Sequence, residues 1–221
     1  MISVALNDEH ILSGSGDPGY YHRLPRDATV RLWRRDGSLL KTFQGHVDSV
    51  RAVCLFKSSE LKHLAVSGAL DGQVMLWHLE NGKAFSSCQL SGACRSLQIL
   101  CQQGSRARLL AGAGEGVAEL AVHHGLQQLR FVAAYVEVAS IASRPTELQR
   151  QDMEQGRWPR SFLSSLRVAV GGVDGQLALL QGSCRAVHDL FRTCPSGDHE
   201  IISIAPRSLD SKPKQFKLRS I

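Results

Sequence analysis

The chain has 221 residues, of which 43% are hydrophobic and 21% are charged, so it can bury a sizeable core and is not disordered throughout. Its most apolar long stretch, residues 131–142, is interrupted by Glu137 and is too short and too polar to cross a bilayer. The formal net charge of +6 favours contact with acidic surfaces but identifies no partner.

A short pattern recurs four times along the chain. Each copy has a glycine three residues before an acid, in the segments 13–17, 67–71, 111–115 and 170–174. A leucine follows five residues after the acid, at Leu32, Leu76, Leu120 and Leu179, if the first copy is counted from Asp27. Asp27, Asp71 and Glu115 are spaced 44 residues apart, within the period of about 40–45 residues that is typical of propeller blades. The pattern therefore predicts successive, similar structural units.

The first unit, residues 2–44, carries Ser13, an acid at Asp17 or Asp27, and Trp33. Residues 18–26 form an insertion between its second and third expected strands. Tyrosine and arginine are enriched at interface hot spots, so we interpret this insertion as a candidate partner-contact loop. A passive surface loop, with a tyrosine packed back onto the sheet, is the alternative. The candidate contact residues are Tyr20, Tyr21, Arg23 and Arg26.

The second unit, residues 45–91, is the best formed. Four short runs of apolar and β-favouring residues lie at 49–56, 64–67, 73–78 and 85–90. The dipeptides Asp71-Gly72 and Asn81-Gly82 lie between runs and supply the positive φ angles that tight hairpin turns need. We therefore expect four sequential antiparallel strands, which make one sheet.

This unit resembles a repeat of the WD-repeat family. The resemblance rests on Gly45-His46, Ser67, Asp71 and Trp77-His78, with His78 in place of the family's final Asp. It covers residues 2–206 and is strongest over 27–90. It implies a β-propeller in which His46, Ser67, Asp71 and Trp77 form a structural hydrogen-bonded set. A partly buried Asp needs donors, which a His ring and backbone N–H groups can supply. By position, the resemblance assigns related structural roles to Ser13, Asp27, Trp33 and Asp174.

The third unit (residues 92–132) and the fourth unit (133–193) keep less of this pattern. The third has Ala111, Glu115 and Ala121 where the second has Ser67, Asp71 and Trp77. A second insertion, residues 144–164, is expected to join the first two strands of the fourth unit and to emerge on the opposite rim. Its charges and prolines favour a flexible loop. A short docking element around residues 148–153, anchored by Trp158, is the alternative.

After the fourth unit, residues 198–206 read as the first strand of a further blade, and residues 207–221 as a basic, mobile tail. We therefore expect an all-β WD-repeat β-propeller of about four four-stranded blades plus one strand of a fifth, as part of a larger ring. Closure of four blades into a ring is the alternative. An open arc would leave strand edges and apolar faces exposed.

No residue pattern points to catalysis, a cofactor or a metal ion. The six cysteines form no C-x-x-C pair, and their apolar surroundings favour buried thiols over disulfides or ligands. His123 and His124 are expected on opposite faces of a strand, which argues against a shared metal ion. No G-x-S-x-G nucleophile motif is present. We therefore predict that the protein is not an enzyme.

The sequence thus favours a scaffold or adaptor that presents propeller rim loops to protein partners. A substrate-binding part of a larger complex, such as a ubiquitin ligase, is a narrower version that rests on analogy of fold. The alternative is a ribonucleoprotein subunit whose basic surface contacts RNA phosphates. Met1 to Leu6 lack the features of a secretory signal, so we expect an intracellular protein, cytoplasmic and/or nuclear.

Overall fold

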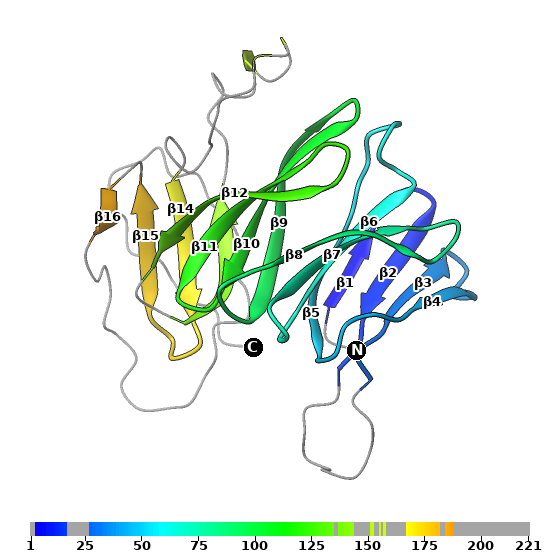
Figure 1. Cartoon of the computed structure of the whole chain (residues 1–221), viewed down its shortest axis with the longest axis horizontal. Coiled ribbons are helices and arrows are strands. Elements are labelled where there is room, and N and C mark those ends of the chain that lie inside the picture. Colours follow the sequence, from blue (N-terminus) through cyan, green and yellow to red (C-terminus); the bar gives the residue numbers. More distant parts are fainter. Residues whose placement is uncertain are drawn as a thin grey trace.

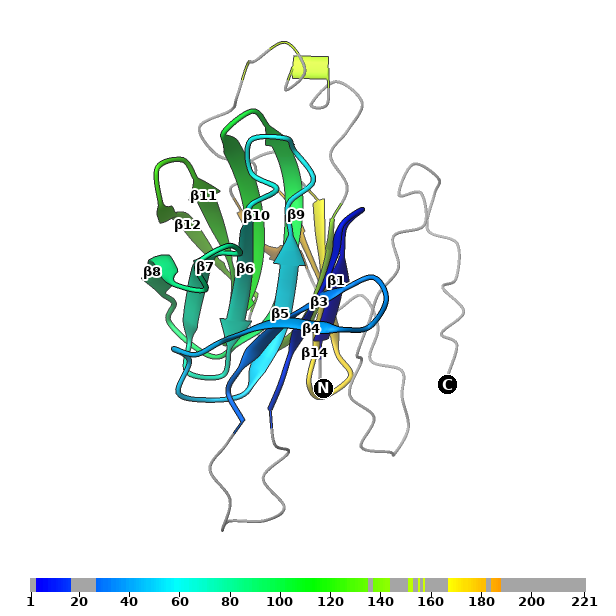
Figure 2. The same ribbon diagram turned by 90° about the vertical axis from the view of Figure 1, so that its right-hand side faces the viewer.

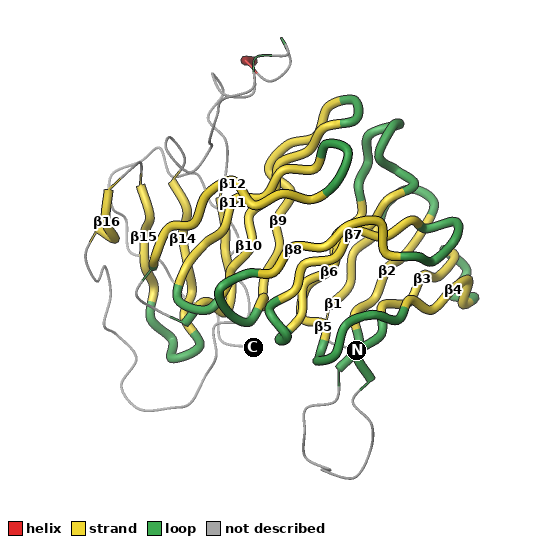
Figure 3. Tube along the Cα trace, in the orientation of Figure 1, coloured by secondary structure: helices red, strands yellow, loops and turns green. Residues whose placement is uncertain are grey.

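The structure is a computed structural model that describes residues 3–16, 27–134, 137–143, 151–152, 155, 157, 167–181 and 184–187. This part of the chain forms four sheets of four antiparallel strands each, and in every sheet the strands follow chain order. Figures 1 and 3 show the sheets side by side, with β1–β4 toward one end and β14–β16 at the other. In the part searched, no helix is long and apolar enough to span a membrane.

The strand bounds are as follows. The first sheet contains β1 (Ser3–Leu6), β2 (His10–Gly14), β3 (Val30–Arg34) and β4 (Leu39–Phe43). The second contains β5 (Val50–Leu55), β6 (Leu64–Ala69), β7 (Gln73–His78) and β8 (Ala84–Gln89). The third contains β9 (Cys94–Gln103), β10 (Arg106–Ala113), β11 (Gly116–Val122) and β12 (Leu126–Ala133). The fourth contains β13 (Val138–Ser143), β14 (Arg167–Gly172), β15 (Leu177–Gln181) and β16 (Cys184–Val187).

The turns of the second sheet form where the sequence predicts them. Gly72 and Gly82 have φ angles of 78° and 74°, a region that favours glycine. The Asp71 carboxylate accepts the Gln73 N–H at 2.8 Å, and the Asn81 side chain accepts the Lys83 N–H at 2.9 Å. These local bonds define the two hairpins and confirm the expected all-β, four-stranded unit.

The first strands of successive sheets lie next to one another. β1 contacts β5, β5 contacts β9, and β9 contacts β13. Figure 2 gives a second view of this arrangement. Side chains link these strands: Gln98 Nε2 donates to the Ser143 carbonyl at 2.8 Å, and the Ser143 N–H donates back to Gln98 Oε1 at 3.0 Å. Each sheet is therefore fixed to the next along its first strand.

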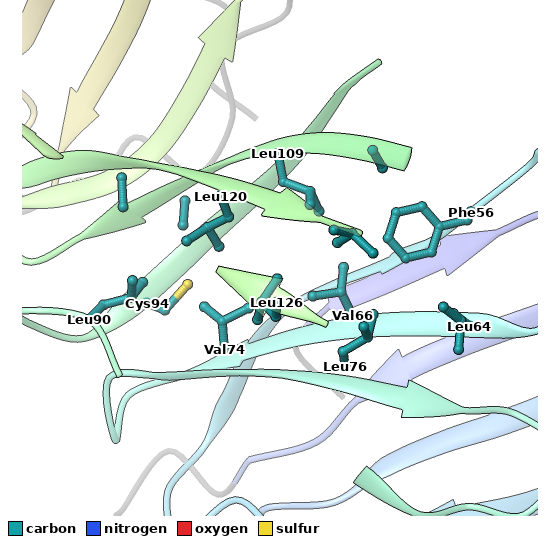
Figure 4. Packing of buried hydrophobic residues seen from close by; sticks show 14 of the residues in the cluster. Phe56, Leu64, Val66, Val74, Leu76, Leu90, Cys94, Leu109, Leu120 and Leu126 are labelled. Atoms are coloured by element: carbon teal, nitrogen blue, oxygen red, sulfur yellow. The ribbon is translucent and has the colours of Figure 1, made fainter. Parts of the chain in front are cut away.

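Each sheet has an upstream face, toward the preceding sheet, and a downstream face, toward the following one. The downstream face of the first sheet packs on the upstream face of the second through Leu12, Val30, Leu32, Ala65, Met75 and Trp77. The second packs on the third through Val66, Val74, Leu76, Leu109, Ala111 and Leu120 (Figure 4). The third packs on the fourth through Leu110, Val117, Val168, Val170 and Leu180. The core thus consists of three layers, one between each pair of neighbouring sheets.

The recurring glycine has a steric explanation. A Cβ atom on Gly14 would lie 2.8 Å from Val50 Cγ1, and one on Gly112 would lie 2.5 Å from Val138 Cγ1. A Cβ on Gly68 would overlap the sulfur of Cys94. Val50, Cys94 and Val138 each begin the first strand of the following sheet. The glycine is therefore required because the next sheet packs directly over it.

The third sheet departs from the register expected from the sequence. Three residues, 70–72, connect β6 to β7, but only residues 114–115 connect β10 to β11. Ser67 therefore pairs with Met75, whereas Ala111 pairs with Ala118, one position earlier along its strand. A shift of one residue turns every side chain of a strand to the opposite face.

This shift corrects one expected correspondence. Leu120, not Ala121, occupies the place of Trp77, since it pairs with Leu109 and packs against the second sheet. Glu119 takes the place of Leu76 and is fully buried on the downstream face. In the fourth sheet, Val170 pairs with Ala178, so the expected register is kept there.

Both insertions interrupt the connections expected from the sequence. The first lies between β2 and β3, and the second lies between β13 and β14. Most of their residues, the expected fifth-blade strand at 198–206 and the tail at 207–221 lie outside the described residues. The proposed unit boundaries at 2–44, 45–91, 92–132 and 133–193 remain predictions, and each sheet falls within one of them apart from Ala133, the last residue of β12.

Candidate functional site

A continuous chain of hydrogen bonds crosses the second sheet. His46 Nδ1 lies 3.0 Å from Asp71 Oδ2, and His46 Nε2 lies 2.7 Å from Ser67 Oγ. Trp77 Nε1 donates to the same Ser67 oxygen at 2.7 Å. The structure therefore brings together the four residues that the family resemblance assigns to one set.

Chemistry fixes the direction of these bonds. A carboxylate only accepts, so the His46 proton lies on Nδ1, and Nε2 accepts from the Ser67 hydroxyl. The hydroxyl oxygen in turn accepts the indole N–H of Trp77, which can only donate. Burial lowers the pKa of His46 below its ordinary value, and the hydrogen bond and charge of Asp71 oppose this only in part. The ring is therefore neutral at pH 7, which this pattern requires.

Asp71 also holds the loop that precedes β5. Its Oδ2 accepts the Val47 N–H at 3.0 Å, as well as the His46 ring. The Val47 side chain is 77% exposed, the largest fraction among the exposed large hydrophobic side chains described. A buried network thus fixes the backbone under an exposed apolar side chain.

The first sheet contains part of the same set. Trp33 Nε1 donates to Ser13 Oγ at 2.8 Å, which matches the bond between Trp77 and Ser67. Asp27 accepts from Ser15 Oγ at 2.9 Å and from Arg31 Nη2 at 2.8 Å. Burial acts to raise the pKa of Asp27, but hydrogen bonds from Thr29 and Ser15 and the Arg31 charge outweigh it, so the pKa lies below its ordinary value. Asp17, the other acid considered for this role, lies outside the described residues.

The third and fourth sheets have simpler contacts at these positions. Ala111 and Leu120 are apolar and fully buried where the second sheet has Ser67 and Trp77. In the fourth sheet, Asp174 Oδ1 accepts the Gln176 N–H at 3.1 Å, which closes the turn between β14 and β15. The polar set is therefore a feature of the first two sheets among the residues described.

The first two sheets meet at one rim. The Val50 N–H donates to the Ser15 carbonyl at 3.1 Å, which joins the start of β5 to the residues just after β2. The loop that contains the exposed Val47 and the residues just after β2 therefore belong to the same edge of the molecule. The five predicted contact residues, Tyr20, Tyr21, Arg23, Arg26 and Trp158, lie outside the described residues. Sequence reasoning missed Val47, although its position directly after Gly45-His46 placed it in a rim loop.

The cysteines for which the structure describes the side chain are poor nucleophiles. Cys54, Cys88, Cys94 and Cys101 are free thiols, and burial raises the pKa of Cys54, Cys94 and Cys101 to about 12. Such thiols react poorly because the thiolate is the nucleophile. Among the described residues, no three His, Cys, Asp or Glu side chains are grouped as metal ligands.

The expectation for the histidine pair was wrong in its geometry. The His123 and His124 rings lie with their centroids 4.1 Å apart, not on opposite faces of a strand. His124 has a φ angle of 59°, because it lies in the turn between β11 and β12. Desolvation, the neighbouring His124 and the charge of Arg106 lower the pKa of His123.

Comparison with known proteins identifies one sequence repeat in this chain and similar folds among solved structures. Residues 37–78 match the sequence model described as "WD domain, G-beta repeat". The chain is also similar to a chain in the crystal structure of the mitotic checkpoint complex, with a TM-score of 0.61 and 15% identity, over 90% of this chain and 53% of that one. A second neighbour is the β-propeller domain of Cps50 (Swd1) from Myceliophteria thermophila, with a TM-score of 0.54 and 12% identity, over 81% and 51%.

A third neighbour is the computationally designed Ika4 protein, with a TM-score of 0.54 and 21% identity, over 82% of this chain and 90% of that one. The chain spans about half the length of the first two neighbours. At these identities the likeness concerns the fold. The chain therefore has the fold of a β-propeller, and its residues 37–78 match a WD repeat in sequence.

Proposed function

We propose that this protein is a non-enzymatic scaffold that binds a protein partner at the rim between its first and second sheets. The observation that carries the proposal is Val47, which is 77% exposed while its backbone is bonded to Asp71. A single exposed apolar side chain is ordinary, but exposed apolar surface that is contiguous with other contact residues marks interaction sites. A fixed backbone lowers the entropy lost on binding.

The 18–26 insertion follows Ser15 closely in the sequence, and Ser15 is bonded to Val50 at this rim. The tyrosines and arginines of the insertion are residue types enriched at hot spots. Val47 would then supply an apolar anchor beside polar and aromatic contacts, which is the usual composition of a protein interface. The candidate contacts Tyr20, Tyr21, Arg23 and Arg26 belong to this proposal.

A narrower role, as the substrate-binding part of a larger complex such as a ubiquitin ligase, is supported only by analogy of fold. One structural neighbour belongs to a multiprotein assembly, the mitotic checkpoint complex. The alternative role, contact with RNA phosphates through the +6 net charge, predicts binding that weakens steeply with salt.

The test is affinity purification of the whole chain with quantitative mass spectrometry, in cells that express wild type, Val47→Asp or a variant lacking residues 18–26. Phe85→Asp is the matched control, because Phe85 is 48% exposed and lies on β8, away from this rim. We expect Val47→Asp to lower recovery of the specific partner at least about tenfold, in line with loss of a hot spot.

Recovery with Phe85→Asp should equal that of wild type. Equal recovery of the same proteins with all four chains would rule out the rim as the contact site. Binding that is abolished by ribonuclease or by moderate salt would instead favour the RNA role.

A further inference from the structure

The upstream face of the first sheet is apolar and has no sheet packed on it among the described residues. Val4 pairs with Ser13, and Leu6 pairs with Ile11, which pairs in turn with Trp33, so these side chains share one face. Val4 is 50% exposed and Leu6 is 58% exposed. Ile11 and Trp33 are half-buried.

The second sheet shows what this face is built for. Val53 pairs with Ser67 as Val4 pairs with Ser13, and Leu55 pairs with Ala65 as Leu6 pairs with Ile11. In the second sheet these positions are covered by the first sheet, and Val53 and Leu55 are only 6% and 5% exposed. The same positions with the same residue types are therefore a packed interface in one sheet and an open surface in the other.

The kind of occupant follows from the three interfaces already present. In each of them, the downstream face of one sheet packs on the upstream face of the next. The complement of the open face is therefore a downstream face. The fourth sheet has a downstream face that no following sheet covers in the described part of the chain. Leu177 and Leu179 lie on this face, because side chains alternate along β15 and Leu180 faces the third sheet. Both leucines are half-buried.

The fourth sheet of the same chain does not reach this face. In the described part of the chain, strands of the first and fourth sheets make no extensive contact, and Figure 1 shows them toward opposite ends. The whole arc aligns with about half of two neighbours, over 90% of this chain and 53% of one, and over 81% of this chain and 51% of the other. One of these neighbours is a β-propeller domain. A second arc of equal size would supply the missing half.

We propose that a second copy of this chain packs the downstream face of its fourth sheet on the upstream face of the first sheet, and the reverse. The two contacts are related by a two-fold axis, so the assembly closes and no sheet face stays open. The site is distinct from the Val47 rim, so the dimer and the proposed partner can be tested separately.

The experiment measures the mass of the 221-residue chain by light scattering and sedimentation over a dilution series. We expect wild type to have twice the monomer mass at micromolar concentration. The double variant Val4→Asp/Leu6→Asp should have the monomer mass, because a charge cannot be buried without a partner. Phe85→Asp, which changes a residue of matched exposure, should remain a dimer.

Circular dichroism checks that the variants keep their strands, and Leu6→Ser replaces the double variant if that one unfolds. A wild-type chain that stays monomeric at tens of micromolar would overturn the proposal. So would a dimer that persists in the folded double variant, since the contact would then lie elsewhere. Open-ended polymers would overturn the closed arrangement.

Discussion

The second and third sheets carry the same repeat in their sequences but differ at one turn. In both, the first strand packs over a glycine of the preceding sheet. Both also contribute leucines to the core that they share. The second has a three-residue connection with Asp71 in the middle, whereas the third has the two residues Gly114 and Glu115. As a result, the equivalent position holds Trp77 in one and Leu120 in the other.

The second and third sheets are therefore stabilised by different interactions at equivalent positions. In the second sheet, His46, Ser67, Asp71 and Trp77 link the rim loop to the sheet through directional bonds. In the third, Leu109 and Leu120 lie in the apolar core against the second sheet. Packing is tolerant of changes in residue type, but a hydrogen-bonded chain fails when one member is lost.

Trp77→Ala should be the most damaging of these changes. It removes a side chain that is 1% exposed and packs against Phe43 with ring centroids 5.6 Å apart. We expect a loss of about 3–5 kcal/mol in the free energy of unfolding, measured by denaturant titration. Leu120→Ala should cost about 2–5 kcal/mol, from the cavity alone. Trp77→Phe keeps most of the side-chain volume, so it separates the effect of the lost bond to Ser67 from that of the lost packing. If Trp77→Phe is as stable as wild type, the bond contributes nothing to the free energy of unfolding.

Ser67→Ala tests the polar chain directly. It leaves both His46 Nε2 and the Trp77 indole N–H without their partner in a buried setting. We expect a loss of about 1–3 kcal/mol in unfolding free energy by the same titration. Ser87→Ala, on the exposed side of β8, is the control and should lie within about 0.5 kcal/mol of wild type.

Gly68→Ala tests the steric reading of the repeat. The new Cβ would overlap the sulfur of Cys94 and lie 3.1 Å from its Cβ. Overpacking of this kind costs about 1–3 kcal/mol. Adding Cys94→Ala should recover part of the loss, because the sulfur is gone. If the double variant is no more stable than the sum of the two single changes predicts, the clash does not explain the glycine.

The smallest effect is a pH dependence that His46 confers on stability. Because burial lowers its folded pKa below the ordinary 6.5, the unfolded state binds the extra proton more readily. The stabilising contribution is complete above the unfolded pKa and is lost as pH falls from there toward the folded pKa. Denaturation midpoints should therefore fall on acidification from pH 7.5 to 5, and less steeply in His46→Gln. Parallel profiles for the two chains would contradict this assignment.

Much of the fold could be predicted from the sequence because its signals are local. Asp71-Gly72 and Asn81-Gly82 set the hairpins of the second sheet, and strand register then follows from alternation. The glycine recurrence marked the second strands of the first three sheets because the next sheet leaves no room for a side chain there. The interpretation failed at Ala121, because the leucine pattern continued unchanged while the turn before it lost one residue. The number of residues between two repeats does not show how the strands of a sheet pair, and the pairing decides which side chain faces the neighbouring sheet.

The candidate site was less accessible. The residues His46, Ser67, Asp71 and Trp77 came from family resemblance, and the structure gives the order of their bonds. The exposure of Val47 and the open face at Val4 and Leu6 could not be read from composition. An apolar residue in a strand looks the same in sequence whether or not another sheet covers it.

Methyl NOE spectroscopy can establish whether β11 has the shifted register. We predict NOEs from the Leu120 methyl groups to Val66 or Leu76, within the core between the second and third sheets. NOEs from Leu120 to Val170 or Leu180 of the fourth sheet instead would show that β11 keeps the register of β7, and would contradict the account.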